Sequence, residues 1–118
     1  MLLIAACKPG TRLVQIDLYF GQSRSDGTTI GDSVVKIFID KHVGLVFRKG
    51  FTVIQAEGKW YDDSSGITYS EESFIISCTD TMTENLSAGI DSLREKYKAA
   101  FQQSAVLRVD KEVLSISN

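Results

Sequence analysis

The chain has 118 residues, of which 43% are hydrophobic and 24% are charged, and its formal net charge is −2. These values are typical of one globular domain with a core large enough to fold without a metal or a disulfide. The slightly negative charge gives no electrostatic basis for binding DNA or RNA, and no stretch approaches the ~20 apolar residues of a transmembrane helix.

The first eleven residues are set apart from the domain that we expect over 12–118. Leu3 to Cys7 resembles the cleavage box of a bacterial lipoprotein, in which the cysteine is lipidated. Only six residues precede Cys7 and none is basic, whereas an export signal has a charged start and about 7–15 apolar residues. As written, the chain indicates a cytoplasmic protein with an apolar N-terminal arm. The alternative is an envelope lipoprotein whose start is truncated, with lipidated Cys7.

Cysteine and histidine are too few to predict a metal site. Cys7 and Cys78 form no metal-binding motif, and His42 is the only histidine, while a zinc site needs about four ligands. Cys78 follows an apolar run and is predicted to be buried as a small hydrophobe; a disulfide between the two cysteines is the alternative. We expect neither a metal nor a cofactor.

The first half of the chain predicts one strand and one helix. Apolar residues at every second position indicate a half-buried strand over 13–20, and residues 21–27 are typical of a loop. A helix is expected over 33–46, capped by Asp32 or Ser33. Its apolar stripe comprises Val35, Phe38, Ile39, Val43 and Val46. His42 borders this stripe, and we interpret it as structural.

The second half predicts a hairpin, a helix and a last strand. Strands over 51–61 and 72–78 are joined by a turn at 62–66, with Phe74, Ile76 and Cys78 pointing inward. A helix starts after Thr83 as its cap and runs to Phe101 with an apolar stripe over four turns. Strand 105–109 follows, and 113–116 is either its continuation past a bulge or a fifth strand.

This order predicts an α+β, ferredoxin-like βαββαβ sandwich: a four-stranded antiparallel sheet with two helices on one face. The opposite, open face is expected to mix polar and apolar side chains. We assign to it Gln15, Asp17, Tyr19, Gln55, Glu57, Ser73, Ile75, Ser77 and Arg108.

Three blocks of the chain, and a short segment between the second and the third, resemble a bacterial family, the domain-of-unknown-function family 3574, over about residues 12–110. The matching positions are Leu18, Tyr19, Phe20 and Gly21; Phe47, Gly50, Thr52, Val53, Gly58 and Trp60; Glu71 and Ser73; and Arg94, Tyr97, Phe101, Gln103, Val106, Leu107, Arg108 and Val109. The chain departs from the family pattern at Asp17, Arg48, Ser104 and Ala105. The resemblance implies no reaction, and many members look exported or lipid-anchored.

The open face holds the candidate catalytic residues, Asp17, Tyr19 and Glu57. Carboxylates beside a tyrosine could perform acid–base chemistry if burial raised a pKa. Asp17 is also expected to lie near Arg108 on the last strand, and the commoner interpretation is a cross-strand ion pair. Only Tyr19 offers a base-stacking aromatic ring there, so RNA binding is not expected.

Two further features could contribute to a ligand site. Glycines 21, 27 and 31 lie between a strand and a helix, where backbone amides and Arg24 could hold an anion, although ordinary loop glycines explain the same pattern. Trp60 either forms the floor of a ligand pocket or, as we prefer, packs against the core. The candidate ligand-binding residues are Tyr19, Arg24, Trp60, Glu71, Gln103 and Arg108.

Three functional hypotheses remain open. The first is a non-enzymatic, homo-oligomeric binding or interaction domain, such as a homodimer, that uses the open face. The second is a small cofactor-free isomerase or lyase with a carboxylate base. The third is a phage-type binder of small anionic nucleotide signals, suggested by Arg12, Arg24, Lys36 and Arg48. Most of the positions that match the family are explained by the fold. The polar ones that are not are Tyr19, Glu71, Gln103 and Arg108, and Asp17 lies beside them.

Overall fold

A computed structural model describes residues 12–117, so the expectations for the N-terminal arm, for Cys7 and for a disulfide to it lie outside the described residues. The elements in chain order are β1 (Leu13–Gly21), α1 (Asp32–Phe38), the π-helical turn η1 (Ile39–Val43), α2 (Gly44–Val46), β2 (Thr52–Asp62), β3 (Ile67–Thr81), α3 (Glu84–Phe101) and β4 (Leu107–Glu112). None of these helices combines the length and apolar character needed to cross a membrane.

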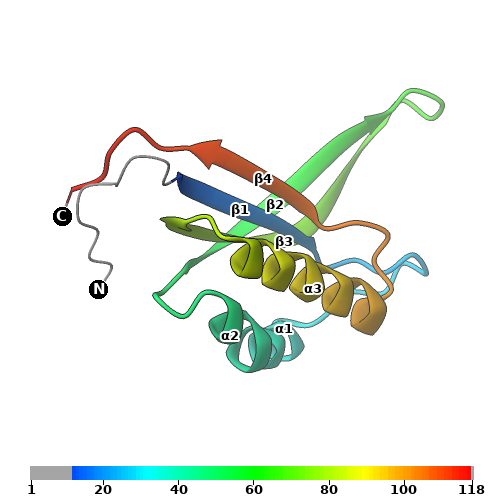
Figure 1. The fold of residues 1–118 in the computed structure, drawn as a ribbon. Coiled ribbons are helices and arrows are strands. Elements are labelled where there is room, and N and C mark those ends of the chain that lie inside the picture. Colours follow the sequence, from blue (N-terminus) through cyan, green and yellow to red (C-terminus); the bar gives the residue numbers. More distant parts are fainter. Residues whose placement is uncertain (1–11, 118) are drawn as a thin grey trace.

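The four strands form one antiparallel sheet in the order β2-β3-β1-β4. All helices lie on one face of this sheet (Figure 1). The arrangement confirms the predicted ferredoxin-like α+β sandwich. β1 pairs with β3 only from Leu13↔Thr81 to Gly21↔Ser73, whereas β2 pairs with β3 as far as Asp62↔Ile67. The β2–β3 hairpin therefore extends beyond the rest of the sheet, as Figure 1 shows.

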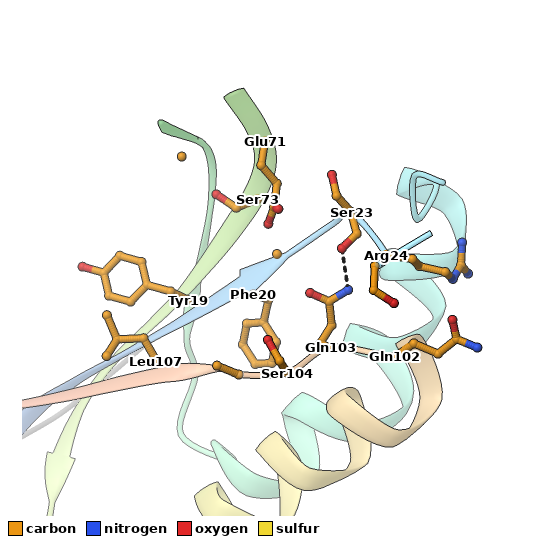
Figure 2. A pocket seen from close by; sticks show the side chains of 14 residues that line it. Tyr19, Phe20, Ser23, Arg24, Glu71, Ser73, Gln102, Gln103, Ser104 and Leu107 are labelled. Atoms are coloured by element: carbon orange, nitrogen blue, oxygen red, sulfur yellow. Dashed lines mark hydrogen bonds between the residues drawn. The ribbon is translucent and has the colours of Figure 1, made fainter. Parts of the chain in front are cut away.

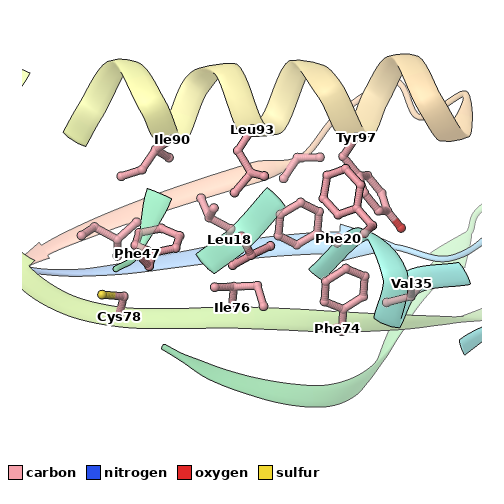
Figure 3. Packing of buried hydrophobic residues seen from close by; sticks show 14 of the residues in the cluster. Leu18, Phe20, Val35, Phe47, Phe74, Ile76, Cys78, Ile90, Leu93 and Tyr97 are labelled. Carbon is pink, nitrogen blue, oxygen red and sulfur yellow. The ribbon is translucent and has the colours of Figure 1, made fainter. Parts of the chain in front are cut away.

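The core lies between the sheet and the helices. Leu18, Phe20, Phe74 and Ile76 point from β1 and β3 toward α3 (Figure 3), and each is at most 2% exposed. The rings of Phe20 and Phe74 stack at 4.7 Å, and Tyr97 meets Phe20 edge-on at 4.8 Å, a geometry that adds to the hydrophobic free energy of burial. The alternation of β1 and β3 thus predicts their buried faces correctly.

The first helix covers the predicted range but contains a π turn over Ile39–Val43. The predicted caps are wrong: Gly31 is the N-cap, and no side chain caps the helix. Asp32 instead accepts a hydrogen bond of 3.1 Å from Nε2 of buried Gln22. A buried amide needs partners, and Asp32 and the carbonyl oxygen of Ile30 accept from it.

The second helix, α3, agrees with its prediction. Oγ1 of Thr83 accepts a hydrogen bond of 3.0 Å from the backbone N–H of Leu86, as a cap does. The last strand ends at Glu112, and 113–116 forms no fifth strand in the described part of the chain. α3 ends at Phe101, and its C-cap, Gln102, has a left-handed backbone with φ of 55°.

The register of β2 contradicts part of the predicted open face. Gln55 pairs with the buried Phe74, and Glu57 pairs with Glu72. Directly paired residues lie on the same side of a sheet, so Gln55 and Glu57 lie on the helix side. The open face instead carries Thr52, Ile54, Ala56, Gly58 and Trp60 from this strand. Both sets of alternate residues in β2 mix polar and apolar types, so their pattern does not select a face.

Candidate functional site

The open face of the sheet contains a cavity of about 740 Å³. It lies where β1 ends, between the start of β4 and the outer part of β3 (Figure 2). The lining residues are Tyr19, Phe20, Gly21, Ser23, Arg24, Ser25, Gly58, Glu71, Ser73, Gln102, Gln103, Ser104, Ala105 and Leu107. Four of the six predicted ligand-binding residues are therefore brought together here: Tyr19, Arg24, Glu71 and Gln103.

Gly21 lines this cavity, and its missing side chain leaves room for the side chains of two other residues. A Cβ at this position would overlap Oε1 of Glu71 and would lie 3.1 Å from Oε1 of Gln103. The hydroxyl of Tyr97, on α3, donates a hydrogen bond of 2.7 Å to the carbonyl oxygen of Gly21. The end of β1 is thereby attached to the helix, and the glycine keeps its position.

The side chain of Gln103 is oriented by the backbone around it. Its Nε2 donates to the carbonyl oxygen of Ser23 at 2.8 Å and to that of Phe101 at 3.2 Å. The amide oxygen is therefore turned toward Gly21 and Glu71 (Figure 2). Among residues 12–117, no donor reaches this oxygen within hydrogen-bonding distance.

Glu71 brings a negative charge to the same place. It pairs with Gly58 across the hairpin, so no side chain covers it from β2. No described residue donates a hydrogen bond to its carboxylate or forms an ion pair with it. Burial raises the pKa of Tyr97 above its ordinary value, and the nearby charge of Glu71 raises this pKa further. Oε1 of Glu71 and Oε1 of Gln103, both hydrogen-bond acceptors, therefore face the same space beside Gly21.

The cavity has an apolar side and a basic rim. Tyr19 is 38% exposed and Leu107 is 59% exposed; they are partners across β1 and β4 and form the apolar side. Arg24 lies in the loop after β1, and its guanidinium points away from Glu71 (Figure 2). It donates to Oγ1 of Thr28 and to the carbonyl oxygen of Thr29, both at 3.4 Å.

Arg108 does not lie on the open face, and its predicted pairing with Asp17 is wrong. It is the β4 partner of buried Leu18, so it points to the helix side. Its guanidinium contacts Asp110 and Asp91, each at 3.0 Å, and donates to the carbonyl oxygen of Ser87 at 3.3 Å. The hydrogen bond to Asp110, followed by the one to Asp91, raises the pKa of Arg108. Arg108 therefore connects β4 to α3.

Asp17 and Glu57 are not combined with Tyr19 into an acid–base set. Asp17 is 7% exposed; it accepts a hydrogen bond of 2.7 Å from Ser77 and lies 3.7 Å from Nζ of Lys111. Glu57 is on the opposite side of the sheet, and its carboxylate forms an ion pair with Nζ of Lys59 at 2.9 Å. The interpretation of Trp60 as a core residue is also wrong, since its side chain is 57% exposed.

The other predicted sites do not form within residues 12–117. Arg12, Lys36 and Arg48 bind separate partners, namely Glu112, Asp40 and the carbonyl oxygen of Leu45, so the basic residues do not converge. The loop amides after β1 also have protein acceptors: those of Gln22, Arg24, Gly27, Thr28 and Ile30.

His42 and Cys78 both contact the core. The ring of His42 lies 4.9 Å from that of Phe38. Cys78 is buried as predicted, and burial raises the pKa of its thiol to about 11. The described residues contain no cluster of three or more histidine, cysteine, aspartate or glutamate side chains suited to a metal ion.

The sequence does not predict the roles of Gly21 and Tyr97 at the cavity. Its pattern indicates only a loop glycine at position 21 and a residue on the inner face of a helix at position 97. Both residues lie in the blocks that resemble the family, and this is the sequence feature that could point to a role for them. Their pairing across 76 residues of chain could come only from the fold.

Comparisons with known proteins give a fold and a family. A phage SAM lyase in complex with S-methyl-5'-thioadenosine is similar, with a TM-score of 0.65 and 19% identity over 94% of this chain and 88% of that chain. A phage SAM lyase in the apo state is similar with a TM-score of 0.60 and 17% identity, over 93% and 87%. At these identities the likeness concerns the fold.

The search of curated proteins finds no match. The model of a family described as a protein of unknown function, DUF3574, matches residues 15–115. That range includes all the helices and all four strands apart from the first two residues of β1. The chain therefore belongs to the DUF3574 family.

Proposed function

We propose that this protein binds a small molecule of the thionucleoside class in the cavity around Gly21, Glu71 and Gln103. The observation that carries the proposal is the position of Glu71: a carboxylate with no partner among the described residues, next to an oriented amide oxygen. Because no described protein group occupies this carboxylate, it is available to a ligand that brings hydrogen-bond donors or a positive charge.

The chemistry of the cavity favours a ligand that carries hydrogen-bond donors. Glu71 and Gln103 both present acceptor oxygens, which suit sugar hydroxyls or a cationic group. Tyr19 and Leu107 supply an apolar surface beside them. The volume of about 740 Å³ is within the usual range for small-molecule sites. The ligand named in the similar phage structure, S-methyl-5'-thioadenosine, combines a sugar diol with an apolar thioether.

Isothermal titration calorimetry with S-methyl-5'-thioadenosine tests the proposal. We expect the Glu71→Gln variant to bind at least ten times more weakly than the wild type. Glu72→Gln is the matched control, because it makes the same change one residue away, on the opposite face of the sheet, at an exposed position. Equal affinities of the two variants, or no binding by the wild type, would overturn the proposal.

A second candidate is an enzyme of the lyase type that acts on S-adenosylmethionine. The activity named for the two similar phage structures favours it. In such a cleavage the carbon–sulfur bond breaks with its electron pair going to sulfur, while an oxygen of the substrate's own carboxylate forms a new bond to the carbon that sulfur leaves. The positive sulfonium becomes a neutral thioether, and the carboxylate loses its negative charge. The carboxylate of Glu71 would attract the sulfonium. Incubation with S-adenosylmethionine should release a thioether detectable by chromatography; binding without release would leave only the binding function.

Association of copies of the chain through the open face is also proposed. Tyr19, Ile54 and Leu107 share this face and are 38%, 44% and 59% exposed. Burying such half-apolar surface is a common source of dimer stability. Light scattering at micromolar concentration measures the mass directly, and a clean monomer would count against association.

A further inference from the structure

The projecting β2–β3 hairpin carries a stacked aromatic pair next to the cavity. Trp60 and Tyr69 are direct partners across the hairpin, and their rings lie 4.7 Å apart with an interplanar angle of 23°. The pair Gly58↔Glu71 is two residues closer to the body of the sheet. Because side chains alternate between faces, these two pairs share one face. The aromatic pair is therefore on the same face as Glu71.

Both rings are exposed to solvent to an unusual degree for their size. Trp60 is 57% exposed and Tyr69 is 40% exposed. β1 pairs with β3 only as far as Ser73, so the main body of the sheet ends before these rings. Stacking uses one face of each ring and holds the pair in one orientation. The outer face of each ring stays free and points away from the other ring, so a flat partner can lie on one of these two faces.

The space between the rings and the cavity is open. Gly58 lines the cavity and precedes Trp60 on this face of β2, and a Cβ there would contact only the carbonyl oxygen of Glu71, at 3.8 Å. Two residues along a strand span ~6.6 Å, which is comparable to the length of a nucleoside from its base to its sugar hydroxyls. A nucleoside with its sugar at Glu71 would place its base over the aromatic pair.

We propose that the stacked pair of Trp60 and Tyr69 is a stacking surface, offering one outer ring face to the planar base of the ligand whose sugar is bound at Glu71. This inference rests on the proposed function and defines the ligand further, as one with an aromatic base. Stacking on an aromatic side chain is available to any planar base, and its loss on substitution by alanine lowers affinity about 10- to 100-fold. The surface thus supplies affinity, while Glu71 and Gln103 orient the sugar.

The fluorescence of Trp60, the only tryptophan of the chain, reports on this contact directly. We expect S-methyl-5'-thioadenosine to quench it in a saturable titration, and 5-methylthioribose, which lacks the base, to leave it unchanged. Calorimetry should show Trp60→Ala and Tyr69→Ala binding S-methyl-5'-thioadenosine about 10- to 100-fold more weakly, and Trp60→Phe within about threefold of the wild type. Tyr61→Ala is the matched control, since Tyr61 is 62% exposed on the other face of the same hairpin, and its affinity should not change.

The outcomes separate this inference from the function on which it rests. If Glu71→Gln abolishes binding and Trp60→Ala binds normally, the stacking surface is overturned and the proposed function stands. If the wild type does not bind S-methyl-5'-thioadenosine, both are overturned. If Trp60 fluorescence changes with protein concentration in the absence of ligand, and light scattering shows that Trp60→Ala dissociates an oligomer, a second copy covers the rings and the stacking surface is overturned.

Discussion

Gly21 and Glu71 share one space in the structure: the carboxylate of Glu71 lies where a side chain at position 21 would begin. The two residues come from adjacent strands, β1 and β3, which pair at Gly21↔Ser73. The hydrogen bond from Tyr97 to the carbonyl oxygen of Gly21 keeps the backbone in place from the other side of the sheet. A glycine at this position is therefore a requirement of the site.

Substitution of Gly21 by alanine is expected to displace Glu71 and to weaken ligand binding by tenfold or more. The added methyl group would also lie 3.1 Å from Oε1 of Gln103, so both acceptors would move. Titration with S-methyl-5'-thioadenosine measures the effect. Gly31→Ala is the control, because a Cβ at Gly31 meets no atom within 4 Å. Equal affinities would show that Glu71 does not need the space above Gly21.

Glu71→Gln is expected to leave the free energy of unfolding within about 0.5 kcal/mol of the wild type. The carboxylate has no partner among the described residues, and it lies near another acceptor oxygen, so its charge adds little to stability. Urea denaturation measures the difference. A loss above about 1 kcal/mol would assign Glu71 a structural role instead of a ligand-binding one.

Tyr97→Phe is expected to destabilise the protein by about 1–2 kcal/mol, because the carbonyl oxygen of Gly21 loses a buried donor. Ligand affinity should fall several-fold as well, since the position of Gly21 is no longer held from the helix side. Denaturation and calorimetry on one preparation give both values. Tyr61→Phe, at an exposed position, should change neither, and an unchanged stability of Tyr97→Phe would contradict the argument.

Stability is expected to fall between about pH 9 and pH 11 because of Cys78. Burial raises the pKa of this thiol from 9.0 to about 11, so over that range the unfolded chain releases a proton that the folded chain retains. The contribution of Cys78 is complete below pH 9 and is lost at about 1.4 kcal/mol per pH unit above it.

Comparison with Cys78→Ala isolates this effect from that of the tyrosines. The variant should be less stable by about 1 kcal/mol at pH 7, owing to the smaller side chain in the core. Its stability should decline less steeply than that of the wild type above pH 9. Parallel curves for the two proteins would show that Cys78 titrates as an exposed thiol does.

Arg108→Met is expected to cost about 1–2 kcal/mol of stability without changing ligand affinity. The side chain is 13% exposed and connects β4 to Asp91 on α3, on the side of the sheet away from the cavity. A double-mutant cycle with Asp91→Asn should give a coupling energy of about 0.5–1 kcal/mol. Weaker binding of S-methyl-5'-thioadenosine by Arg108→Met would place Arg108 in the site after all.

The buried face of β1 and β3 could be derived from the chain because alternate residues there differ sharply in polarity. Leu18, Phe20, Phe74 and Ile76 are apolar, and the residues between them are mixed or polar. A period of two with such contrast admits one orientation. The stripe of α3 and its Thr83 cap are local features of the same kind, and both are confirmed.

The orientation of β2 could not be derived in this way. Val53 and Gln55 alternate with Ile54 and Ala56, so either face is chemically acceptable, and a shift of one residue exchanges the faces. Pairing with β3 decides the matter, since Gln55 lies opposite Phe74. Arg108 is a similar case: its partner across the sheet, Leu18, shows which way it points.

By itself, the sequence determined the order of the elements, the α+β sandwich, the core of β1, β3 and α3, and the family to which the chain belongs. Only the tertiary structure decided which polar residues of the signature meet. Tyr19, Glu71 and Gln103 converge at the end of β1, whereas Arg108 and Asp17 bind other partners. The reason is physical: hydrophobic periodicity acts within one element, while a site is made by strand register and by contacts between segments far apart in the chain.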